Sequence, residues 1–487
     1  MSGSEASSLL VALLADPSRR PVGPLLIPTI DQVRPRGLEA VEIAPPGSKS
    51  LTNRAILLAA LAKGVSTLRR PLVDAADAEV MLEAVERLGA RVTRAQSLLR
   101  IEGVAGRWCP ARVEADGSVH LHLRNAGTAV RFLAGSVLCS PVPVVIDGDA
   151  RMHDRPIGEL ASWLGRLGCE VAFLGRRNDC PPLRIMPPAN LPVDASIAVG
   201  ASPSSQFISS LLLAGPFMPG GLTLRLERPP VSESYIRMTA GLLGRVGVEV
   251  KSSHDGRILR VPASAGDPPC IEGFDLDIEP DASGAVPFWA AAAMAGRPEV
   301  ACRVDGLGVD SLQGDVRVVQ ALGRMGAAVD MRPSLAGGRI EVRAAPSLRP
   351  ILVDCADMPD AAMALACVAC FAEGTSILRG LGTLRVKECD RIAAMQSELA
   401  KIGVRVEADV AGDADAVTIT PPVGGVDCSP AVPPVCFDTF EDHRMAMAFA
   451  LIGLRRPNTW INDPGCVAKT YPAFWRDLAT FLAGAAG

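Results

Sequence analysis

Four short motifs in the first half of the chain place basic or hydroxyl side chains where helices are expected to begin. The first, APPGSKSLTNRA at residues 44–55, precedes the apolar run ILLAALAKG. Pro and Gly end an extended segment there, and Ser48 or Ser50 can cap the helix that follows. Lys49 and Arg54 then lie near the positive N-terminal end of this helix, which favours anions. The motif predicts a phosphate or carboxylate site, and the alternative is a capped helix with solvated cations.

The second and third motifs add glycine and arginine residues near predicted turns. In LRNAGTAVRFL, Gly127 would expose backbone N–H groups to a ligand, and Arg131 follows one helical turn later on the same face. In DGDARMHDRPIG, Arg151 could clamp a carboxylate with two parallel hydrogen bonds, whereas Arg155 could simply pair with Asp154. Both motifs extend the predicted anion site.

The fourth motif, SPSSQF, opens another apolar helix and contains Ser204, Ser205 and Gln206. Hydroxyl and amide groups at the start of a helix can bind phosphate without adding charge. The first half of the chain therefore offers both charged and neutral ligands for an anion.

The second half of the chain contains the candidates for acid-base chemistry. In DMPDAAM, Asp360 is placed to begin a helix, and the alternative is a plain N-cap. If LRVKECDRI is helical, Lys387 and Glu388 both reach Arg391, at spacings of four and three residues. That arrangement brings cations and a carboxylate together on one surface, and the alternative is an ordinary surface salt-bridge ladder.

Two further motifs, DHRMAM and DPGCVAKT, add the cations Arg444 and Lys469. Of the five histidines, only His443 adjoins such a cluster, and the sequence shows no metal-ligand spacing. The pair Cys367 and Cys370 lies in an apolar stretch without a nearby histidine, so we expect buried thiols instead of zinc or redox chemistry. We expect neither a metal nor another cofactor.

Composition limits the classes of partner. The net charge of −4 and the 4% of aromatic residues argue against nucleic acid and anionic membranes as partners. Thirteen scattered cysteines are typical of reduced thiols in a cytoplasmic protein, and no apolar run is long enough to span a bilayer. Residues 1–38 are expected to form a poorly ordered N-terminal extension.

The elements that must position these motifs repeat along the chain. Five amphipathic segments each end in an apolar residue, a glycine and a short β-rich run, and successive glycines are 79, 79, 79 and 77 residues apart. These glycines are Gly89, Gly168, Gly247, Gly326 and Gly403. A sixth such helix ends at Gly484, so we expect about six helix-to-strand modules, divided three and three, in an α/β or α+β architecture.

Ten motifs in this order resemble the family of 5-enolpyruvylshikimate-3-phosphate synthases. They are PPGSKSLTNRA, RNAGTAVRFL, DGDARMHDRPIG, SPSSQF, EPDASGA, LQGD, DMPDAAM, LRVKECDRI, DHRMAM and DPGCVAKT. The resemblance implies the two-domain enolpyruvyl transferase fold, an inside-out α/β barrel of six βαβαββ units, three in each domain. One domain would combine residues 39–47 and 281–487, the other would be the inserted residues 48–280, and the active site would lie in the interdomain cleft.

The resemblance also implies a reaction. The enolpyruvyl group of phosphoenolpyruvate moves to the 5-hydroxyl of 3-phosphoshikimate, and phosphate is released, as a step of the shikimate pathway to aromatic amino acids. Asp360, alone or with Lys49, would take the hydroxyl proton, and Glu388 would protonate the C3 methylene and later remove that proton. The residues implied for 3-phosphoshikimate are Lys49, Ser50, Arg54, Ser204, Ser205, Gln206, Ser232, Tyr235, Asp360 and Lys387. Those implied for phosphoenolpyruvate are Lys49, Gly127, Arg151, Gln206, Arg391, Arg444 and Lys469.

Three positions depart from the family pattern, namely Arg124, where Gly is usual, Arg237, where Asp is common, and Thr383, where some members carry Asn. Gly127 leaves the phosphoenolpyruvate pocket open, so we expect glyphosate to compete with phosphoenolpyruvate. The alternatives are the related transferase that acts on UDP-N-acetylglucosamine and a non-catalytic binding protein with the same scaffold. We expect a cytoplasmic monomer that binds small molecules and no nucleic acid or membrane.

Overall fold

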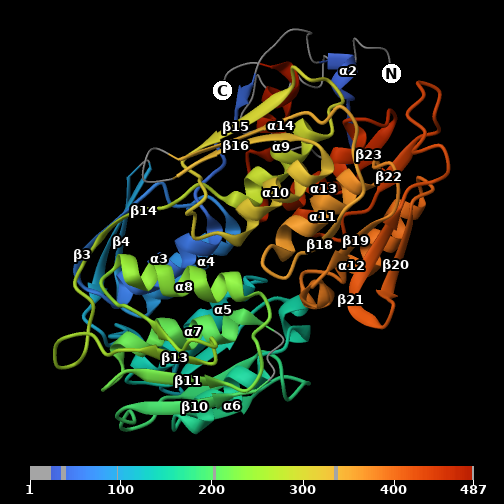
Figure 1. The fold of residues 1–487 in the computed structure, drawn as a ribbon. Helices are drawn as coiled ribbons and strands as arrows, with labels where there is room; N and C mark the ends of the chain where they lie inside the picture. Colours follow the sequence, from blue (N-terminus) through green and yellow to red (C-terminus); the bar gives the residue numbers. More distant parts are fainter. Residues whose placement is uncertain (1–22, 34–39, 96, 201–203, 334–337, 485–487) are drawn as a thin grey trace. The chain divides into compact units, whose positions relative to one another are not determined.

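The fold is described from a computed structural model, which covers residues 23–33, 40–95, 97–200, 204–333 and 338–484. The contacts between residues divide the chain into two units (Figure 1). Unit 1 comprises residues 1–46 and 280–487, and unit 2 comprises residues 47–279. The domain boundaries expected from the sequence, 47/48 and 280/281, each lie one residue from these.

Unit 2 contains three four-stranded sheets, in each of which the first pair of strands is parallel and the other pairs are antiparallel. In spatial order the sheets are β14 (Asp275–Asp277), β3 (Lys63–Arg69), β5 (Leu98–Val104) and β4 (Arg91–Ala95); β6 (Val119–His122), β7 (Val144–Asp147), β9 (Leu183–Met186) and β8 (Glu170–Phe173); and β10 (Ala195–Val199), β11 (Leu222–Leu226), β13 (Ile258–Val261) and β12 (Lys251–Ser252).

Unit 1 repeats this plan with two four-stranded sheets and one three-stranded sheet. In spatial order they are β16 (Ala328–Arg332), β17 (Arg339–Arg343), β15 (Ala301–Asp305) and β2 (Val41–Glu42); β18 (Leu352–Asp354), β19 (Ser376–Arg379), β21 (Asp413–Thr420) and β20 (Arg405–Val410); and β1 (Leu25–Ile27), β23 (Thr459–Ile461) and β22 (Val435–Phe437).

The helices of each unit fall into a buried set and an amphipathic set. The buried helices are α3 (Lys49–Leu61), α5 (Gly127–Ser136) and α7 (Ser205–Ala214) in unit 2, and α9 (Ala282–Ala293), α11 (Ala362–Ala369) and α13 (His443–Gly453) in unit 1. The amphipathic helices are α4 (Ala76–Arg87), α6 (Gly158–Arg166), α8 (Glu233–Arg245), α10 (Val318–Met325), α12 (Arg391–Ala400) and α14 (Phe474–Ala483). Short elements are α2 (Ile30–Val33), η1 (Val137–Cys139), η2 (Ala150–Asp154), η3 (Gly215–Phe217), η4 (Gly314–Arg317), η6 (Pro359–Ala361), η7 (Gly382–Val386) and η8 (Pro464–Lys469).

The buried helices pack against one another because their side chains are small and apolar all round. α11 reads AMALACVA and is buried along its whole length, and it contacts both α9 and α13. In unit 2, α3, α5 and α7 contact one another in the same way. A helix that is apolar on every face must be surrounded by other elements, so the sheets and amphipathic helices cover these three in each unit.

The repeat predicted from the sequence is present. All six of the repeated glycines have a positive φ, between +71° and +118°, where a helix ends before the next strand. Two copies take their first strand from a distant part of the chain, since β14 pairs with β3 and β2 pairs with β15, both in parallel. The expected α/β arrangement of three copies per unit is therefore confirmed.

The expectation of a poorly ordered extension is wrong for part of residues 1–38. β1 pairs antiparallel with β23, and Leu25, Ile27 and Ile30 are buried against unit 1. In the sheet of the sixth copy, β1 is the third strand beside β23 and β22. Residues 1–22 and 34–39 lie outside the described residues. Within the described ranges, no helix is both long and apolar enough to cross a membrane.

Candidate active site

The three buried helices of unit 2 each begin with one of the motifs identified in the sequence. Lys49 is the first residue of α3, Gly127 is the first residue of α5, and Ser205 is the first residue of α7. Ser204 caps α7, and its Oγ accepts a hydrogen bond from the backbone N–H of Gln206 at 3.3 Å. Because helix N-termini present unpaired N–H groups and a partial positive charge, these positions suit anions.

Lys49 is held at the start of α3 by an ion pair. Its Nζ lies 3.3 Å from Oδ2 of Asp77, a buried carboxylate in the first turn of α4. Ser48 occupies the N-cap position of α3, but its side chain makes no capping hydrogen bond. The ion pair with Asp77, which was not predicted from the sequence, therefore holds the side chain of Lys49 in place.

Arg54 is enclosed by protein. Its three nitrogens donate to Thr239 Oγ1 at 2.8 Å, to the carbonyl of Ser50 at 2.8 Å, and to the carbonyl of Tyr235 at 3.3 Å. Its guanidinium also lies 4.9 Å from the centre of the Phe132 ring. Burial lowers the pKa of Arg54 to about 10. Arg54 therefore holds the start of α3 and the start of α8 together.

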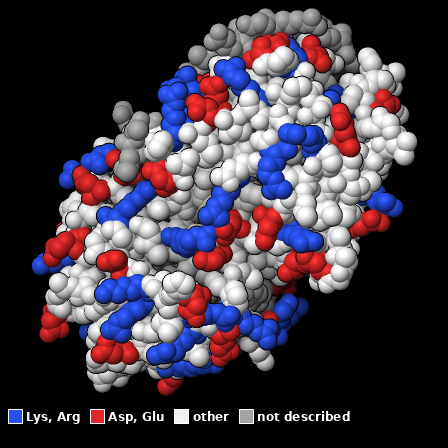
Figure 2. All heavy atoms as spheres, in the orientation of Figure 1, with Lys and Arg blue, Asp and Glu red and all other residues white. Residues whose placement is uncertain are grey.

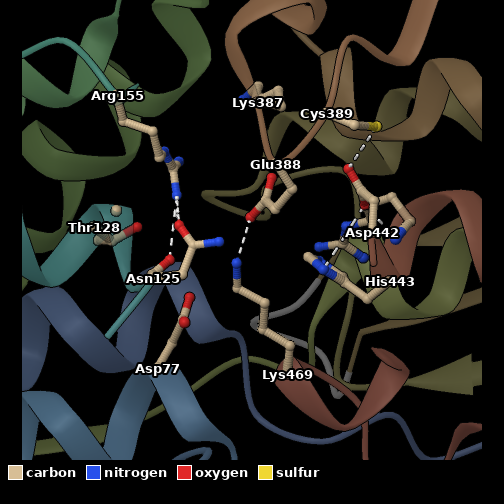
Figure 3. A network of polar contacts seen from close by, with 12 residues as sticks. Asp77, Asn125, Thr128, Arg155, Lys387, Glu388, Cys389, Asp442, His443 and Lys469 are labelled. Carbon is tan, nitrogen blue, oxygen red and sulfur yellow. Dashed lines mark hydrogen bonds and ion pairs between the residues drawn. The ribbon is translucent and has the colours of Figure 1, made fainter. Parts of the chain in front are cut away.

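The two arginines of DGDARMHDRPIG differ in exposure and in their contacts. Arg151 is half-exposed, and its Nη1 lies 3.9 Å from Asp154. Arg155 is buried, and its Nη1 donates to the carbonyl and to Oδ1 of Asn125 at 3.2 and 3.0 Å (Figure 3). A Cβ on Gly127 would lie only 2.5 Å from Nη2 of Arg155, so the guanidinium covers the start of α5. Arg155 therefore lies at the start of α5, whereas Arg151 lies near Asp154.

Other predicted residues of unit 2 surround the same helix starts. Gln206 Nε2 donates to Thr128 Oγ1 at 3.3 Å, which joins the first turns of α7 and α5. Ser232 occupies the N-cap position of α8 with a φ of +49°, and Tyr235 lies in the first turn of that helix. Arg131 is buried and donates to the carbonyls of its own unit, at Gly127 and Pro156, so it supports α5 instead of facing a ligand.

In unit 1, Asp360 lies among three cations. Its Oδ1 is 3.0 Å from Nη1 of Arg391 and 3.6 Å from Nζ of Lys387, and its Oδ2 is 3.8 Å from Nε of Arg444. The plain N-cap alternative is wrong, because Asp360 lies inside the short helix η6 and the N-cap of α11 is Ala361.

Glu388 is held by two cations. Its Oε1 lies 2.8 Å from Nζ of Lys469 (Figure 3). Its Oε2 lies 3.4 Å from Nη2 of Arg391. The helix expected over LRVKECDRI is wrong, because Lys387 is extended and α12 begins only at Arg391, where Asp390 is the N-cap. The expected convergence of charges still occurs, because Lys387 and Arg391 meet on Asp360 through tertiary contacts.

Asp442, which was not singled out from the sequence, lies at the centre of this network. It caps α13 by accepting the backbone N–H of Arg444 at 2.8 Å. Its two carboxylate oxygens accept from Nε and Nη2 of Arg391 at 2.8 and 3.2 Å. Both side chains are almost fully buried, which excludes the surface salt-bridge alternative, and the surrounding carboxylates raise the pKa of Arg391 well above its usual value.

The arrangement supports acid-base chemistry on an anionic molecule. Five carboxyl groups and four cations gather in unit 1 around Asp360, so most of the positive charge is already balanced by protein carboxylates. The cations are Lys387, Arg391, Arg444 and Lys469, and the carboxyls are Asp281, Asp315, Asp360, Glu388 and Asp442. An anion that binds these cations must compete with the carboxylates, and this competition favours proton uptake by a carboxylate.

Comparisons with known proteins agree with this chemistry. The family model of EPSP synthase (3-phosphoshikimate 1-carboxyvinyltransferase) matches residues 35–478. The 3-phosphoshikimate 1-carboxyvinyltransferase of Ralstonia pickettii is 41% identical over 440 residues, which cover 88% of this chain and 94% of that protein. The one of Laribacter hongkongensis is 42% identical over 446 residues, which cover 91% and 96%. The chain belongs to the EPSP synthase family.

Two solved structures of low identity support the fold alone. An EPSP synthase from Acinetobacter baumannii aligns with a TM-score of 0.72 at 24% identity, covering 93% of this chain and 97% of its own. The enolpyruvyl transferase NikO from Streptomyces tendae aligns with a TM-score of 0.68 at 18% identity, covering 95% of this chain and 98% of that one.

The activity of the chain follows from the family model and the curated relatives. It is that of the EPSP synthase family, a transferase step of the shikimate pathway.

The positions that depart from the EPSP synthase pattern have defined surroundings. Arg124 has a φ of +47°, a conformation in which Gly is favoured, and its Nη1 lies 3.6 Å from Glu79. Arg237 Nη1 lies 2.9 Å from Glu233, one turn earlier in α8. Both arginines are therefore half-exposed and paired with glutamates, while the Thr383 hydroxyl is buried in η7 without a hydrogen-bond partner among the described residues.

The cysteine pair has the structural place expected of it. Cys367 lies in α11 and Cys370 is its C-cap, and both are fully buried. Burial raises the pKa of both thiols above the usual value, so they stay protonated. Among the described residues, no group of three or more His, Cys, Asp and Glu side chains is placed to hold a metal ion.

Proposed function

We propose that this chain transfers the enolpyruvyl group of phosphoenolpyruvate to the 5-hydroxyl of 3-phosphoshikimate through two carboxyls of unit 1, Asp360 and Glu388. The observation that carries the proposal is the placement of these carboxyls on opposite sides of one buried cation, Arg391, at 3.0 and 3.4 Å. Each has further cations of its own, Lys387 and Arg444 at Asp360 and Lys469 at Glu388. One carboxyl can therefore act as base while the other acts as acid.

Asp360 is proposed as the base. Three cations within 4 Å stabilise its carboxylate form. In that form it can accept the proton of the 5-hydroxyl as the hydroxyl oxygen attacks C2 of phosphoenolpyruvate. Lys49 of unit 2 is proposed to assist through its positive charge, which its ion pair with Asp77 maintains.

Glu388 is proposed as the acid at C3, and it must therefore carry a proton when the substrates are bound. In the structure, Lys469 and Arg391 instead stabilise its carboxylate. Phosphoenolpyruvate brings a phosphate and a carboxylate that compete for these cations, and their arrival favours protonation of Glu388. The protonated carboxyl then delivers its proton to the methylene, and the carboxylate takes it back as phosphate leaves.

We propose binding residues for each substrate. For phosphoenolpyruvate we retain Lys49, Gly127, Gln206, Arg391, Arg444 and Lys469, and replace Arg151 by Arg155. For 3-phosphoshikimate we retain Lys49, Ser50, Ser204, Ser205, Gln206, Ser232, Tyr235, Asp360 and Lys387. Arg54 becomes a positioning residue, because its nitrogens already donate to Thr239, Ser50 and Tyr235.

Phosphate release by the purified protein, given both substrates, tests this proposal. UDP-N-acetylglucosamine in place of 3-phosphoshikimate, and no acceptor, are the controls. Release with 3-phosphoshikimate alone is expected, and release with UDP-N-acetylglucosamine or with none would contradict the proposal.

Two matched variants test whether Arg155 or Arg151 binds phosphoenolpyruvate. Arg155→Ala should raise the KM for phosphoenolpyruvate at least about tenfold, the loss of one charged hydrogen bond. Arg151→Ala should change it less than about twofold, because exposed pairs contribute little. The reverse pattern would return the role to Arg151.

We also propose that the protein is a cytoplasmic monomer with small-molecule substrates. All thirteen cysteines are free thiols, which suits a reducing compartment. Acidic and basic side chains are interspersed over the face shown in Figure 2, which favours small molecules over nucleic acid as partners. Light scattering of the purified protein measures the mass, and a dimer would contradict the monomer.

A further inference from the structure

A buried carboxyl that has no role in the reaction proposed above lies beside Asp360. Asp315 belongs to η4 in unit 1 and is 4% exposed. Its Oδ2 accepts a hydrogen bond from the hydroxyl of Ser283, in the first turn of α9. A carboxyl this well enclosed has little water to stabilise its charge, so its ionisation depends on its protein neighbours.

The backbone around Asp315 is fixed on both sides. Gln313 accepts the backbone N–H of Ala282 at 2.9 Å and donates to the carbonyl of Pro280 at 2.7 Å, which joins η4 to the start of α9. On the other side, Arg317 Nη1 forms an ion pair with Asp357, three residues before Asp360. The carboxyl of Asp315 is thus held between the start of α9 and the turn that carries Asp360.

The charged groups facing Asp315 come from four segments. They are Asp281 at the N-cap of α9, Asp360 of η6, Arg444 of α13 and the thiol of Cys355. Arg317 on η4 itself pairs with Asp357. Burial raises the pKa of Cys355 to about 12, so this thiol is neutral. Burial and the charge of Asp360 raise the pKa of Asp315 to about 7, against smaller opposing effects of Ser283 and Arg444.

The protonation of Asp315 decides the charge balance of the cluster in unit 1. With Asp315 neutral, four carboxylates face four cations, whereas its ionisation leaves one negative charge in excess. The extra charge is buried, where solvent screens it weakly. It would lie near Arg444, which is within 4 Å of both Asp281 and Asp360, and would oppose the binding of an anion there.

We propose that Asp315 is a positioning residue that, neutral and held by Ser283, leaves Arg444 and the carboxylate of Asp360 available to the anionic substrate. This inference rests on the proposed function, because it presumes that Arg444 binds phosphoenolpyruvate and that Asp360 is the base. Ionisation of Asp315 would weaken substrate binding without removing either group.

The KM for phosphoenolpyruvate, measured by phosphate release between pH 5.5 and 9, tests the proposal. The wild type and Asp315→Asn are compared as a ratio at each pH, which cancels the titration of the substrate phosphate near pH 6. The ratio of wild-type to variant KM should rise at least about threefold as the pH passes through about 7, since the amide never ionises. Asp357→Asn is the matched control. It removes a more exposed carboxylate, which pairs with Arg317 of the same segment, and it should keep the pH dependence of KM seen in the wild type.

Ser283→Ala gives a second test, in which the direction of a shift in the pH dependence of KM is predicted. The serine hydroxyl stabilises the ionised form of Asp315, so its removal should shift the rise in KM to higher pH. Infrared spectroscopy of the substrate-free proteins adds a readout that does not depend on turnover. A carboxylic acid band that titrates near pH 7 should be present in the wild type and absent in Asp315→Asn.

Three results would overturn the inference: a constant ratio for Asp315→Asn, an unshifted profile for Ser283→Ala, or a loss of the rise in Asp357→Asn. If Asp315→Asn does not fold, Ser283→Ala and the wild-type infrared titration decide the matter. Wild-type protein that releases no phosphate would instead refute the proposed function, and the infrared band would still report the protonation of Asp315.

Discussion

Replacement of Gly127 by Ala tests the place of Arg155 at the start of α5. The new Cβ would lie 2.5 Å from Nη2 and 2.8 Å from Cζ of Arg155. Ordinary contacts between such atoms are about 3.5 Å, so the guanidinium must move by about 1 Å. Its hydrogen bonds to Asn125, now 3.0 and 3.2 Å long, would then exceed the usual limit of about 3.2 Å.

The displaced Arg155 is then expected to lose one charged hydrogen bond to phosphoenolpyruvate, about 1.5 to 3 kcal/mol. At 1.4 kcal/mol for each factor of ten, the KM for phosphoenolpyruvate should rise about 10- to 100-fold. Turnover at saturation should change far less, because the proposed acid and base, Asp360 and Glu388, belong to unit 1, whereas Gly127 and Arg155 belong to unit 2. The fold should stay intact, because the clash involves the end of a flexible side chain.

Steady-state phosphate release with varied phosphoenolpyruvate measures both constants, and Gly165→Ala is the matched control. Gly165 lies in α6 of the same unit, and a Cβ there would meet no atom within 4 Å. Glyphosate should inhibit the wild type in competition with phosphoenolpyruvate, and its inhibition of Gly127→Ala should weaken in parallel. A KM within twofold of wild type, with inhibition unchanged, would refute the placement of Arg155 at the phosphoenolpyruvate site.

Four further outcomes are expected. Glu388→Gln should lower turnover at least about 100-fold while calorimetry still detects substrate binding, and near-normal turnover would remove Glu388 from the mechanism. Arg124→Gly should leave the free energy of unfolding equal or raise it by up to about 1 kcal/mol in denaturant titrations, because a left-handed residue is strained and its exposed ion pair contributes little; a clear loss of stability would contradict this. The raised pKa of Asp315 gives stability that is full below its unfolded value of 3.8 and lost as the pH rises through about 7, so Asp315→Asn should gain stability over wild type from pH 6 to 8.5, by about 1.4 kcal/mol; thermal unfolding at both pH values would show no such gain if the carboxyl were ionised throughout. Cys367 should resist alkylation in the native protein but react after unfolding, and mass spectrometry would detect native labelling if its burial were wrong.

The repeated helices were predictable because their pattern is local. A helix that ends in glycine needs only the apolar spacing and a residue that accepts a positive φ, and both are visible in the chain. All six of the repeated glycines adopt that conformation. The strand β1 escaped prediction because its partner, β23, lies more than 430 residues later, and no local pattern reports such a pairing.

The residue types of the candidate site were predictable, but their partners were not. Lys387 was expected to reach Arg391 along a helix, whereas the segment is irregular and the two meet only at Asp360. The burial of Arg155 in DGDARMHDRPIG was not predictable, because sequence spacing does not reveal which side chain a turn buries. The hydrogen bond of Arg155 to Asn125 spans 30 residues, which local reasoning does not cover.

The sequence by itself determined the copy number of the repeat, the family, and the set of charged and hydroxyl residues at helix starts, because each of these follows from residue type and spacing along the chain. Only the tertiary structure decided which of these charges are buried and paired. It brought Asp442, Asp360 and Glu388 onto one arginine. It also enclosed Asp315 beside Asp360. Burial and distance set the energy of a charge, and both exist only once segments far apart in the chain have packed together.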